Sequence, residues 1–359
     1  MSGAATLSVV LPNYNHAKLI GRALEALTSQ ERAPDEIIVV DDASSDDSVR
    51  VIEAFAATAP AVTLLRNAHN MGVISALERG LRAARGTYVY FAAADDFVLP
   101  GFFETALRRL DANSDLGLFC GGAVLIEGRT NRRLAMRPAV WPRMNAGRVD
   151  PASVRRLLET TDNWILTGSS VFRRECVLWA GGLDIKLGPF ADGMLGRKLA
   201  LKFGFFFEPK PVATWAIFSD SQSRHAALDL DKTRHFLDSV PAWIATDPVF
   251  PAWYANTFRN RWRFGTCRLV LQGRPLDRKF ILAVGARSTA EGATLERIMA
   301  LPDWLARPAT LALLWYRLRP IALGALLRTT FASRIAQLSS GYWFGPARRG
   351  LASAPADSG

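Results

Sequence analysis

The sequence is poor in cysteine, and this scarcity limits the kinds of site that it can build. Its 359 residues include three cysteines, Cys120, Cys176 and Cys267, which are far apart and odd in number. They therefore form no zinc-binding or disulfide pattern, and such an arrangement fits a reducing compartment. We therefore expect all three to be ordinary packing residues. Hydrophobic residues make up 49% of the sequence, which suits a folded protein.

The sequence also lacks a long uninterrupted apolar segment. Residues 7–11 are too few for the core of a signal sequence. Residues 309–338 are rich in apolar side chains, but Arg317, Arg319 and Pro320 interrupt them, so neither half reaches the roughly 20 residues that cross a bilayer. We therefore expect a cytoplasmic protein.

Acidic residues are scarce in the last third of the chain. Residues 251–359 hold 16 Lys and Arg against 5 Asp and Glu, whereas residues 1–250 hold 28 of each, so the net charge of +11 arises at the C-terminal end. This asymmetry predicts an anionic partner there, either a membrane surface or nucleic acid. Two arrangements fit residues 309–338, an interfacial helix pair on lipid headgroups or an amphipathic cap packed on the protein.

Short apolar strands alternate with helical segments in the first hundred residues. The pattern predicts strands at residues 7–11, 36–40, 62–65 and 86–94 and helices at 17–29, 46–57 and 73–84. Strands that alternate with helices of about 10 to 15 residues indicate βαβ units in a mostly parallel sheet, which places the fold in the α/β class. The chain continues with a helix at 102–110, a strand near 116–124 and a buried strand at 203–207.

Polar side chains follow three of these strands at the point where each strand ends. They are Pro12, Asn13, Tyr14 and Asn15 after the first strand, Asp41 and Asp42 after the second, and Asp95 and Asp96 after the fourth. The carboxyl ends of parallel strands meet at one edge of the sheet, where open α/β sheets bind ligands. A ring and amides suit a nucleotide base, and adjacent carboxylates suit a divalent metal that holds a diphosphate. Asp95 and Asp96 also fit a simple turn or helix cap before Pro100.

Six segments resemble glycosyltransferase family 2 and occur in the order that this family has. They are LSVVLPNYN at residues 7–15, IVVDDAS at 38–44, NMG at 70–72, YVYFAAADDFVLP at 88–100, GGLD at 181–184 and FADGMLGRKLA at 190–200. Together they span about residues 5–215. The resemblance implies the GT-A fold, a Rossmann-like, mostly parallel sheet flanked by helices.

The resemblance divides the chain into three parts. We expect a GT-A domain at residues 1–218, with a nucleotide-binding half at about 1–100 and an acceptor half at about 101–218. Residues 219–345 would form a basic, helical C-terminal extension, and residues 346–359 a disordered tail.

The resemblance also implies roles for the polar residues at the edge. Residues that would bind the nucleotide sugar are Pro12, Asn13, Tyr14, Asn15, Asp41, Asp42, Asn70, Gly72 and Asp95. Asp95 matches the second acid of the family's Asp-x-Asp motif, so Asp95 and Asp96 would hold a divalent metal, Mn²⁺ or Mg²⁺. Such a metal neutralises the charge that develops on a departing diphosphate.

Asp192 matches the aspartate of the family's Glu-Asp motif, which is the general base in inverting members. Removing the proton of an attacking hydroxyl typically gains about 10² to 10⁴ in rate. The chain departs from the family pattern at two places, because Ala93 stands for the first acid of Asp-x-Asp and Ala191 for the glutamate of Glu-Asp. A catalytically inactive protein that binds nucleotide sugars is therefore the alternative to an enzyme.

Two further residues are candidates for the acceptor side of the site. Trp164 could stack on a sugar ring, or it could lie in the core. Arg197 follows Asp192 by about one helical turn, so it could contact a diphosphate or pair with a carboxylate.

The sequence thus predicts an inverting glycosyltransferase that moves a sugar from a nucleotide diphosphate sugar, with a UDP-sugar expected, to a hydroxyl acceptor. By family analogy, the acceptor is a bacterial surface polysaccharide or a lipid-linked glycan. The basic C-terminal region would bring the protein to an anionic membrane surface, as a peripheral protein of its inner face. Nucleic acid is not expected as a partner, because the acidic edge would repel a polyanion.

Overall fold

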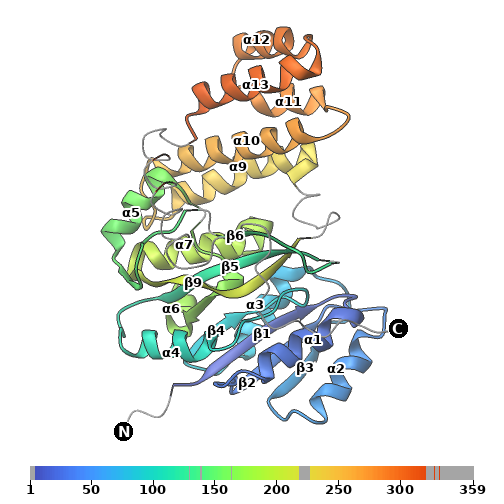
Figure 1. Cartoon of the computed structure of the whole chain (residues 1–359), viewed down its shortest axis with the longest axis vertical. Helices are drawn as coiled ribbons and strands as arrows, with labels where there is room; N and C mark the ends of the chain where they lie inside the picture. The colour runs from blue at the N-terminus through green and yellow to red at the C-terminus, as the bar shows by residue number, and fades with distance from the viewer. Residues whose placement is uncertain are drawn as a thin grey trace.

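A computed structural model describes residues 5–128, 130–137, 140–162, 164–217 and 227–320, together with residues 327 and 331. Within them, a sheet flanked by helices is followed by a stack of further helices (Figure 1). The α/β class and the helical C-terminal extension that the sequence predicts are both present. The tail expected at residues 346–359 lies outside the described residues.

The first four strands form the parallel half of the sheet. β1 (Leu7–Asn13) lies between β2 (Glu36–Asp41) and β4 (Tyr88–Phe91), and β3 (Val62–Arg66) lies outside β2. All three pairings are parallel. The connecting helices are α1 (Ala17–Thr28), α2 (Ser48–Ala56) and α3 (Val73–Ala83). The predicted βαβ units are confirmed, although β4 ends earlier than expected, so the acidic pair lies in the turn beyond it.

The second half of the sheet is mixed. Its strands are β5 (Leu118–Glu127), β6 (Arg133–Arg137), β7 (Gly147–Val149), β8 (Ser170–Arg173) and β9 (Phe205–Ile217). The strand order is β3-β2-β1-β4-β8-β5-β9-β7, with β6 also paired to β5. Because β8 runs antiparallel to both β4 and β5, β5 and β9 point in the same direction as β1 to β4. The carboxyl ends of β1, β2, β4, β5 and β9 therefore face one edge.

Helices cover both faces of the sheet. One face carries α1, α2 and α4 (Phe102–Asp111), and the other carries α3, α5 (Pro151–Thr160), α6 (Arg174–Trp179) and α7 (Ala191–Phe203). After α7, Gly204 turns the chain into β9 through a left-handed backbone conformation, with φ 73°. The strand predicted at residues 203–207 therefore begins two residues late, because the end of the helix takes its first position.

The first two C-terminal helices extend the core of the sheet domain. α9 (Leu230–Thr246) and α10 (Tyr254–Gln272) contribute buried side chains to the same apolar cluster as α7. A polar contact reinforces this packing, since the Trp243 Nε1–H group donates to the Asp184 carboxylate over 2.9 Å. The Gly-Gly-Leu-Asp segment of the family resemblance thus serves as an anchor for α9.

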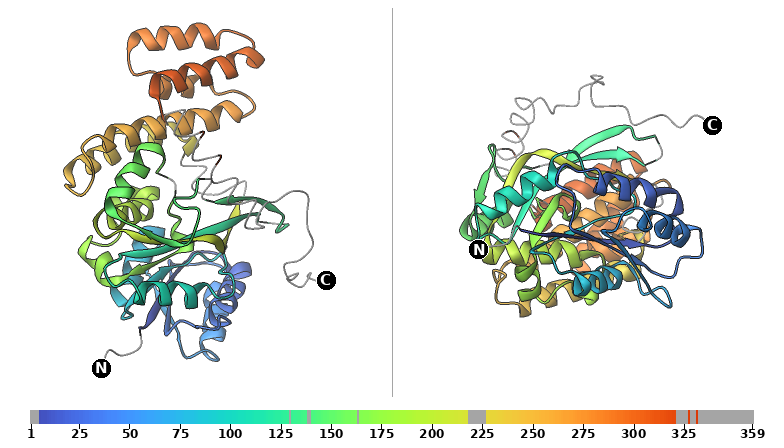
Figure 2. Two further views of the ribbon diagram at one scale, coloured as in Figure 1. Left: turned by 60° about the vertical axis from the view of Figure 1, so that its left-hand side comes forward. Right: turned by 90° about the horizontal axis from the view of Figure 1, so that it is seen from below.

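The remaining helices form a separate layer. α11 (Arg278–Gly285), α12 (Thr289–Met299) and α13 (Asp303–Leu318) enclose a second apolar cluster against the distal part of α10. Figure 2 shows that this layer lies on the far side of α9 and α10 from the sheet. All three cysteines are buried and unpaired, as the sequence predicts.

Candidate active site

The ends of β1 and β2 are joined by a closed network of hydrogen bonds. Asn13 donates from Nδ2 to Asp41 Oδ1 over 2.8 Å and to Ser44 Oγ over 3.1 Å. Asp41 also accepts from the Ser44 backbone N–H and hydroxyl, at 3.0 and 2.6 Å. Asn13 and Asp41 are both buried. One atom of this network has no hydrogen-bond partner among the described residues, the buried Asn13 Oδ1. Buried polar atoms are normally hydrogen-bonded, so a ligand or a water is expected to bind here.

The loop after β1 exposes one ring. Asn15 has a left-handed backbone with φ 56°, and its Oδ1 accepts from the N–H groups of Ser45 and Asp46 at 2.8 and 3.3 Å. Asn15 therefore shapes the loop, and Pro12 is partly buried at its start. Tyr14 is 41% exposed, so its ring can stack on a planar ligand.

Asp42 fixes the loop that precedes α3. Its buried carboxylate accepts from Asn67 Nδ2 at 2.6 Å and from the backbone N–H groups of Met71 and Gly72 at 2.9 and 2.7 Å. Gly72 is needed here for its φ of 88° rather than for space, because nothing lies within 4 Å of an added Cβ. The Asn70 side chain also accepts from the Gly72 N–H, over 3.0 Å. These contacts fix the conformation of the loop before α3, at the carboxyl edge of the sheet.

Asp95 and Asp96 are much less engaged. Asp96 Oδ1 accepts from the Ala216 N–H at the end of β9 over 2.7 Å, whereas Asp95 accepts no hydrogen bond from the part of the chain that the structure describes. Burial is the main cause that raises the pKa of Asp96 to about 8, and the negative charge of the neighbouring Asp95 carboxylate adds to it. Two crowded carboxylates of this kind suit a hard divalent cation, which would relieve their repulsion.

The donor set at this position is small. Among the described residues, no three or more His, Cys, Asp and Glu side chains gather closely enough to form a metal site by themselves. Asp95 and Asp96 also border a narrow hollow on the α1 side, where the Arg22 guanidinium lies 4.3 Å from the centre of the Phe97 ring. The protein thus fits a cation that takes its other ligands from water or a bound molecule.

Asp192 lies in the first turn of α7, where the helix dipole favours a carboxylate. Its Oδ2 accepts from the Thr167 hydroxyl over 2.8 Å and its Oδ1 from the Gly193 N–H over 2.6 Å. Thr167 belongs to the short helix η1 (Thr167–Ser169). Asp192 is therefore held by a side chain that sequence reasoning missed.

The short helix η1 connects the predicted base with the acidic pair. A methyl group placed on Gly168 would lie 3.7 Å from Asp96 Oδ2, and the Gly168 carbonyl accepts from the Tyr90 hydroxyl over 3.0 Å. Since the preceding residue, Thr167, binds Asp192, both Asp192 and Asp96 lie next to η1. The structure thus brings together acids that lie almost a hundred residues apart in the sequence.

The prediction of Trp164 as a sugar platform is wrong. The side chain is fully buried, with 0% exposure, and it stacks on Phe205 with ring centres 5.0 Å apart. Its Nε1–H group donates to the Thr161 carbonyl over 3.1 Å. Both faces of the indole are therefore closed to a sugar, and the core alternative is the correct one.

Arg197, five residues after Asp192 on α7, bonds to the protein backbone. Its Nε and Nη2 donate to the Asp162 carbonyl over 2.9 and 2.6 Å. Burial disfavours its charge, but Tyr254, Asp162 and Asp192 raise its pKa overall. These contacts favour a positioning part for Arg197, and its predicted contact with a ligand stays a prediction.

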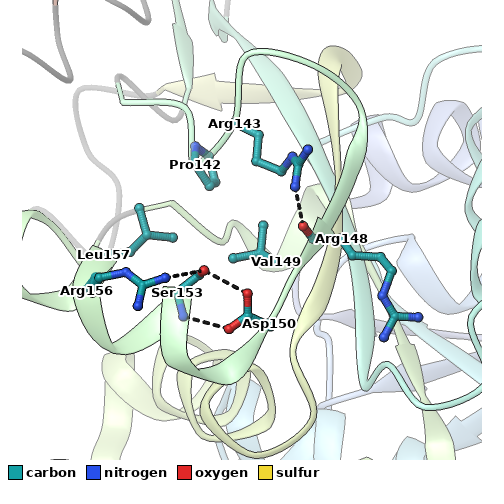
Figure 3. Close-up of a pocket in the computed structure, with 8 residues that line it drawn as sticks. All are labelled: Pro142, Arg143, Arg148, Val149, Asp150, Ser153, Arg156 and Leu157. Atoms are coloured by element: carbon teal, nitrogen blue, oxygen red, sulfur yellow. Dashed lines mark hydrogen bonds between the residues drawn. The ribbon is translucent and has the colours of Figure 1, made fainter.

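A separate hollow of about 260 Å³ lies beside β7 and the start of α5 (Figure 3). Its lining residues are Pro142, Arg143, Arg148, Val149, Asp150, Ser153, Arg156 and Leu157. It borders β7, where Val149 pairs with Phe205 at the amino end of β9, so it lies at the opposite edge of the sheet. Asp150 is engaged in capping α5 through Ser153. The candidate active site is therefore the carboxyl edge.

Comparison with known proteins agrees with this location. Residues 8–175 match the model of the glycosyl transferase family 2. An uncharacterised protein of Mycobacterium tuberculosis is 30% identical over 258 residues, which cover 68% of this chain and 77% of the relative. The uncharacterised glycosyltransferase YibD of Escherichia coli is 32% identical over 181 residues, which cover 50% of this chain and 49% of YibD.

Solved structures show the same fold over nearly the whole chain. TarS 1–349 of S. aureus, in complex with UDP-GlcNAc, superposes with a TM-score of 0.62 at 16% identity and covers 94% of this chain and 92% of its own. The mannosyltransferase PcManGT of Pyrobaculum calidifontis, in complex with GDP-Man and Mn²⁺, gives 0.55 at 20% identity, covering 95% and 88%. The fold is thus that of GT-A glycosyltransferases. The chain belongs to glycosyltransferase family 2.

Proposed function

We propose that this glycosyltransferase moves a sugar from a nucleotide diphosphate sugar to a hydroxyl acceptor with inversion at the anomeric carbon. The proposal rests on one observation: Asp192 and Asp96 both lie next to η1, at Thr167 and at Gly168. Inversion needs a base on one side of the reacting carbon and a stabilised leaving group on the other. The carboxyl edge supplies acids for both parts.

In this proposal, Asp192 takes the proton of the acceptor hydroxyl as that oxygen attacks. The Thr167 hydroxyl holds one carboxylate oxygen, which fixes the direction of the other. General base catalysis of this kind contributes about 10² to 10⁴ in rate. Ala191 removes a neighbouring acid of the family motif but leaves this proton acceptor in place.

Asp95 and Asp96 would hold Mn²⁺ or Mg²⁺ together with the donor diphosphate. When bound, such an ion neutralises the negative charge that grows on the departing diphosphate. Two carboxylates are enough protein ligands in this view, because Mg²⁺ is commonly bound by one or two carboxylates together with substrate phosphates. Ala93 removes one further acid but neither of these two.

On the donor side, Tyr14 and Asn13 are the groups that we assign to the nucleoside. The exposed Tyr14 ring offers a stacking surface, and the unpaired Asn13 Oδ1 is left to accept a hydrogen bond from a ligand. Complexes of the structural neighbours contain UDP-GlcNAc and GDP-Man, so both uridine and guanosine donors occur on this fold. We propose a UDP-sugar donor and a surface polysaccharide or lipid-linked glycan as acceptor.

Calorimetric titration with UDP, GDP, CDP and dTDP tests the proposal. Each nucleotide is added with manganese, with magnesium or with a chelator, to the wild type and to Asp95→Ala. We expect tight binding of one nucleotide that needs both the metal and Asp95. Binding that is equal with metal and chelator would contradict the metal site, and binding without any sugar transfer or donor hydrolysis would favour the inactive alternative.

A further inference from the structure

Helix α13 presents an apolar face to solvent. The inward side of α13 consists of Ala306, Thr310, Leu314 and Leu318, which are buried. The opposite side and the residue just before the helix form what we term the α13 stripe: Leu301, Trp304, Leu305, Pro308, Ala312 and Tyr316, all exposed. Spacings of three and four residues place these side chains on one face of the helix. The stripe contains no charged residue.

The exposure of this stripe is large for apolar side chains. Trp304 is 76% exposed and Tyr316 is 67% exposed, and Leu301 and Leu305 reach 37% and 38%. A helix that is apolar on both its buried and its exposed face is unusual in a protein surrounded by water alone. Contiguous exposed apolar surface of this kind marks an interaction site.

The described chain beyond α13 does not cover the stripe. Leu327 and Phe331 are themselves 62% and 71% exposed, so they add apolar surface instead of hiding it. They are four residues apart, which is the spacing of one helix face. The occupant of the stripe therefore has to come from outside the described part of the chain.

The positive charge of the C-terminal helices indicates which kind of partner the α13 stripe binds. Residues 251–320 hold 12 Lys and Arg against 4 Asp and Glu. Two of these acids, Glu291 and Asp303, already form ion pairs with arginines of the same layer. Arg297 before the stripe and Arg319 after it form no ion pair with any residue that the structure describes, and Arg317 lies 6.0 Å from the centre of the Tyr316 ring and also acts on the Glu291 carboxylate from a distance. An apolar stripe with unpaired cations at both ends is complementary to anionic lipid.

We propose that the α13 stripe docks on the surface of an anionic lipid bilayer. Trp304 and Tyr316 would lie at the level of the headgroups, where amphipathic rings are favoured, and the flanking arginines would meet lipid phosphates. None of the described helices is long and apolar enough to span a membrane, so the contact lies in the interface. This inference goes beyond the proposed reaction and does not depend on it.

A second copy of the chain is the less favourable occupant. A contact between two α13 stripes would bring together two layers that each carry the same excess of positive charge. Like charges across an interface weaken association, whereas anionic headgroups neutralise them. Charge therefore favours lipid over self-association.

Vesicle sedimentation with the full chain tests this inference. The vesicles contain phosphatidylcholine alone or phosphatidylcholine with phosphatidylglycerol. We expect binding to the anionic vesicles only, weakened by salt because the charge contribution is screened. The double variant Trp304→Ser/Tyr316→Ser should bind about tenfold less tightly or worse, since two large apolar contacts are lost.

The control variant is Trp179→Ser, which removes a tryptophan that is 47% exposed on α6 of the GT-A domain. It should bind anionic vesicles like the wild type, and thermal unfolding checks that all variants are folded. Equal vesicle binding by the double variant and the wild type would overturn the inference. So would the absence of wild-type binding, or a dimer in sedimentation equilibrium that the double variant abolishes. Nucleotide titration of the same samples reports on the proposed reaction separately.

Discussion

Two Asp-Asp pairs stand on either side of β1, and their carboxylates have different surroundings. Asp41 and Asp42 are buried, and each accepts at least three hydrogen bonds from the protein. Asp96 accepts one, from Ala216, and Asp95 accepts none from the described residues. A carboxylate whose lone pairs are already engaged is not free to coordinate a metal. The same dipeptide is therefore held by several hydrogen bonds after β2 and by only one after β4, and the predicted contact of Asp41 and Asp42 with a nucleotide stays a prediction.

Asp192 is a fifth acid at this edge, and its substitution should give the largest effect. We expect Asp192→Asn to lower the turnover number about 10² to 10⁴-fold, because the amide cannot take the proton of the acceptor hydroxyl. Donor binding should remain close to that of the wild type. Initial rates with saturating donor, beside calorimetric titration of the nucleotide, separate the two quantities. Unchanged turnover would remove Asp192 from the reaction.

The substitution Asp95→Ala tests whether the second pair is the metal-binding one. Nucleotide affinity in the presence of manganese should fall about a hundredfold, whereas affinity in chelator should stay the same, since a bound ion is worth several kcal/mol. The melting temperature should be retained because Asp95 bonds to no described residue. A large loss of stability would show that Asp95, like Asp41 and Asp42, is held by contacts within the protein.

The substitution Asp42→Ala makes the reverse test on the first pair. It leaves the Asn67 amide and the Met71 and Gly72 N–H groups without their acceptor, so we expect a loss of about 1–3 kcal/mol in the free energy of unfolding. Metal dependence should be retained. Urea unfolding measures the effect, and Asp47→Ala, an exposed acid on the same side of the sheet, serves as the control.

The smallest effect is expected at Thr167. Thr167→Val should lower turnover about tenfold with little change in the Michaelis constant for the donor, because the base loses one of its two hydrogen bonds. Thr167→Ser keeps the hydroxyl and should restore most of the rate. Steady-state kinetics of both variants decide the matter, and equal rates for valine and serine would argue against positioning by Thr167.

Much of the fold could be predicted from local pattern. The βαβ units, the edge with its acids and the helical C-terminal region all follow from alternation of apolar and polar residues over short windows. The roles of Thr167 and Trp164 could not be predicted in this way. Thr167 meets Asp192 across 25 residues, and Trp164 stacks on Phe205, so both depend on packing between distant segments.

The order of strands and helices in the parallel half, and the polar residues that follow each strand, could be predicted from the sequence, since hydrophobic period is a local property, although β4 ends at Phe91 instead of residue 94. The sequence thereby placed Asp41, Asp42, Asp95 and Asp96 at one edge. Which of these acids accept few hydrogen bonds depends on tertiary packing, because their hydrogen-bond partners lie up to 120 positions away in the sequence. The same holds for α13, whose apolar pattern allows either burial or exposure. One face of α13 packs on the neighbouring helices, and the α13 stripe on the opposite face is therefore exposed.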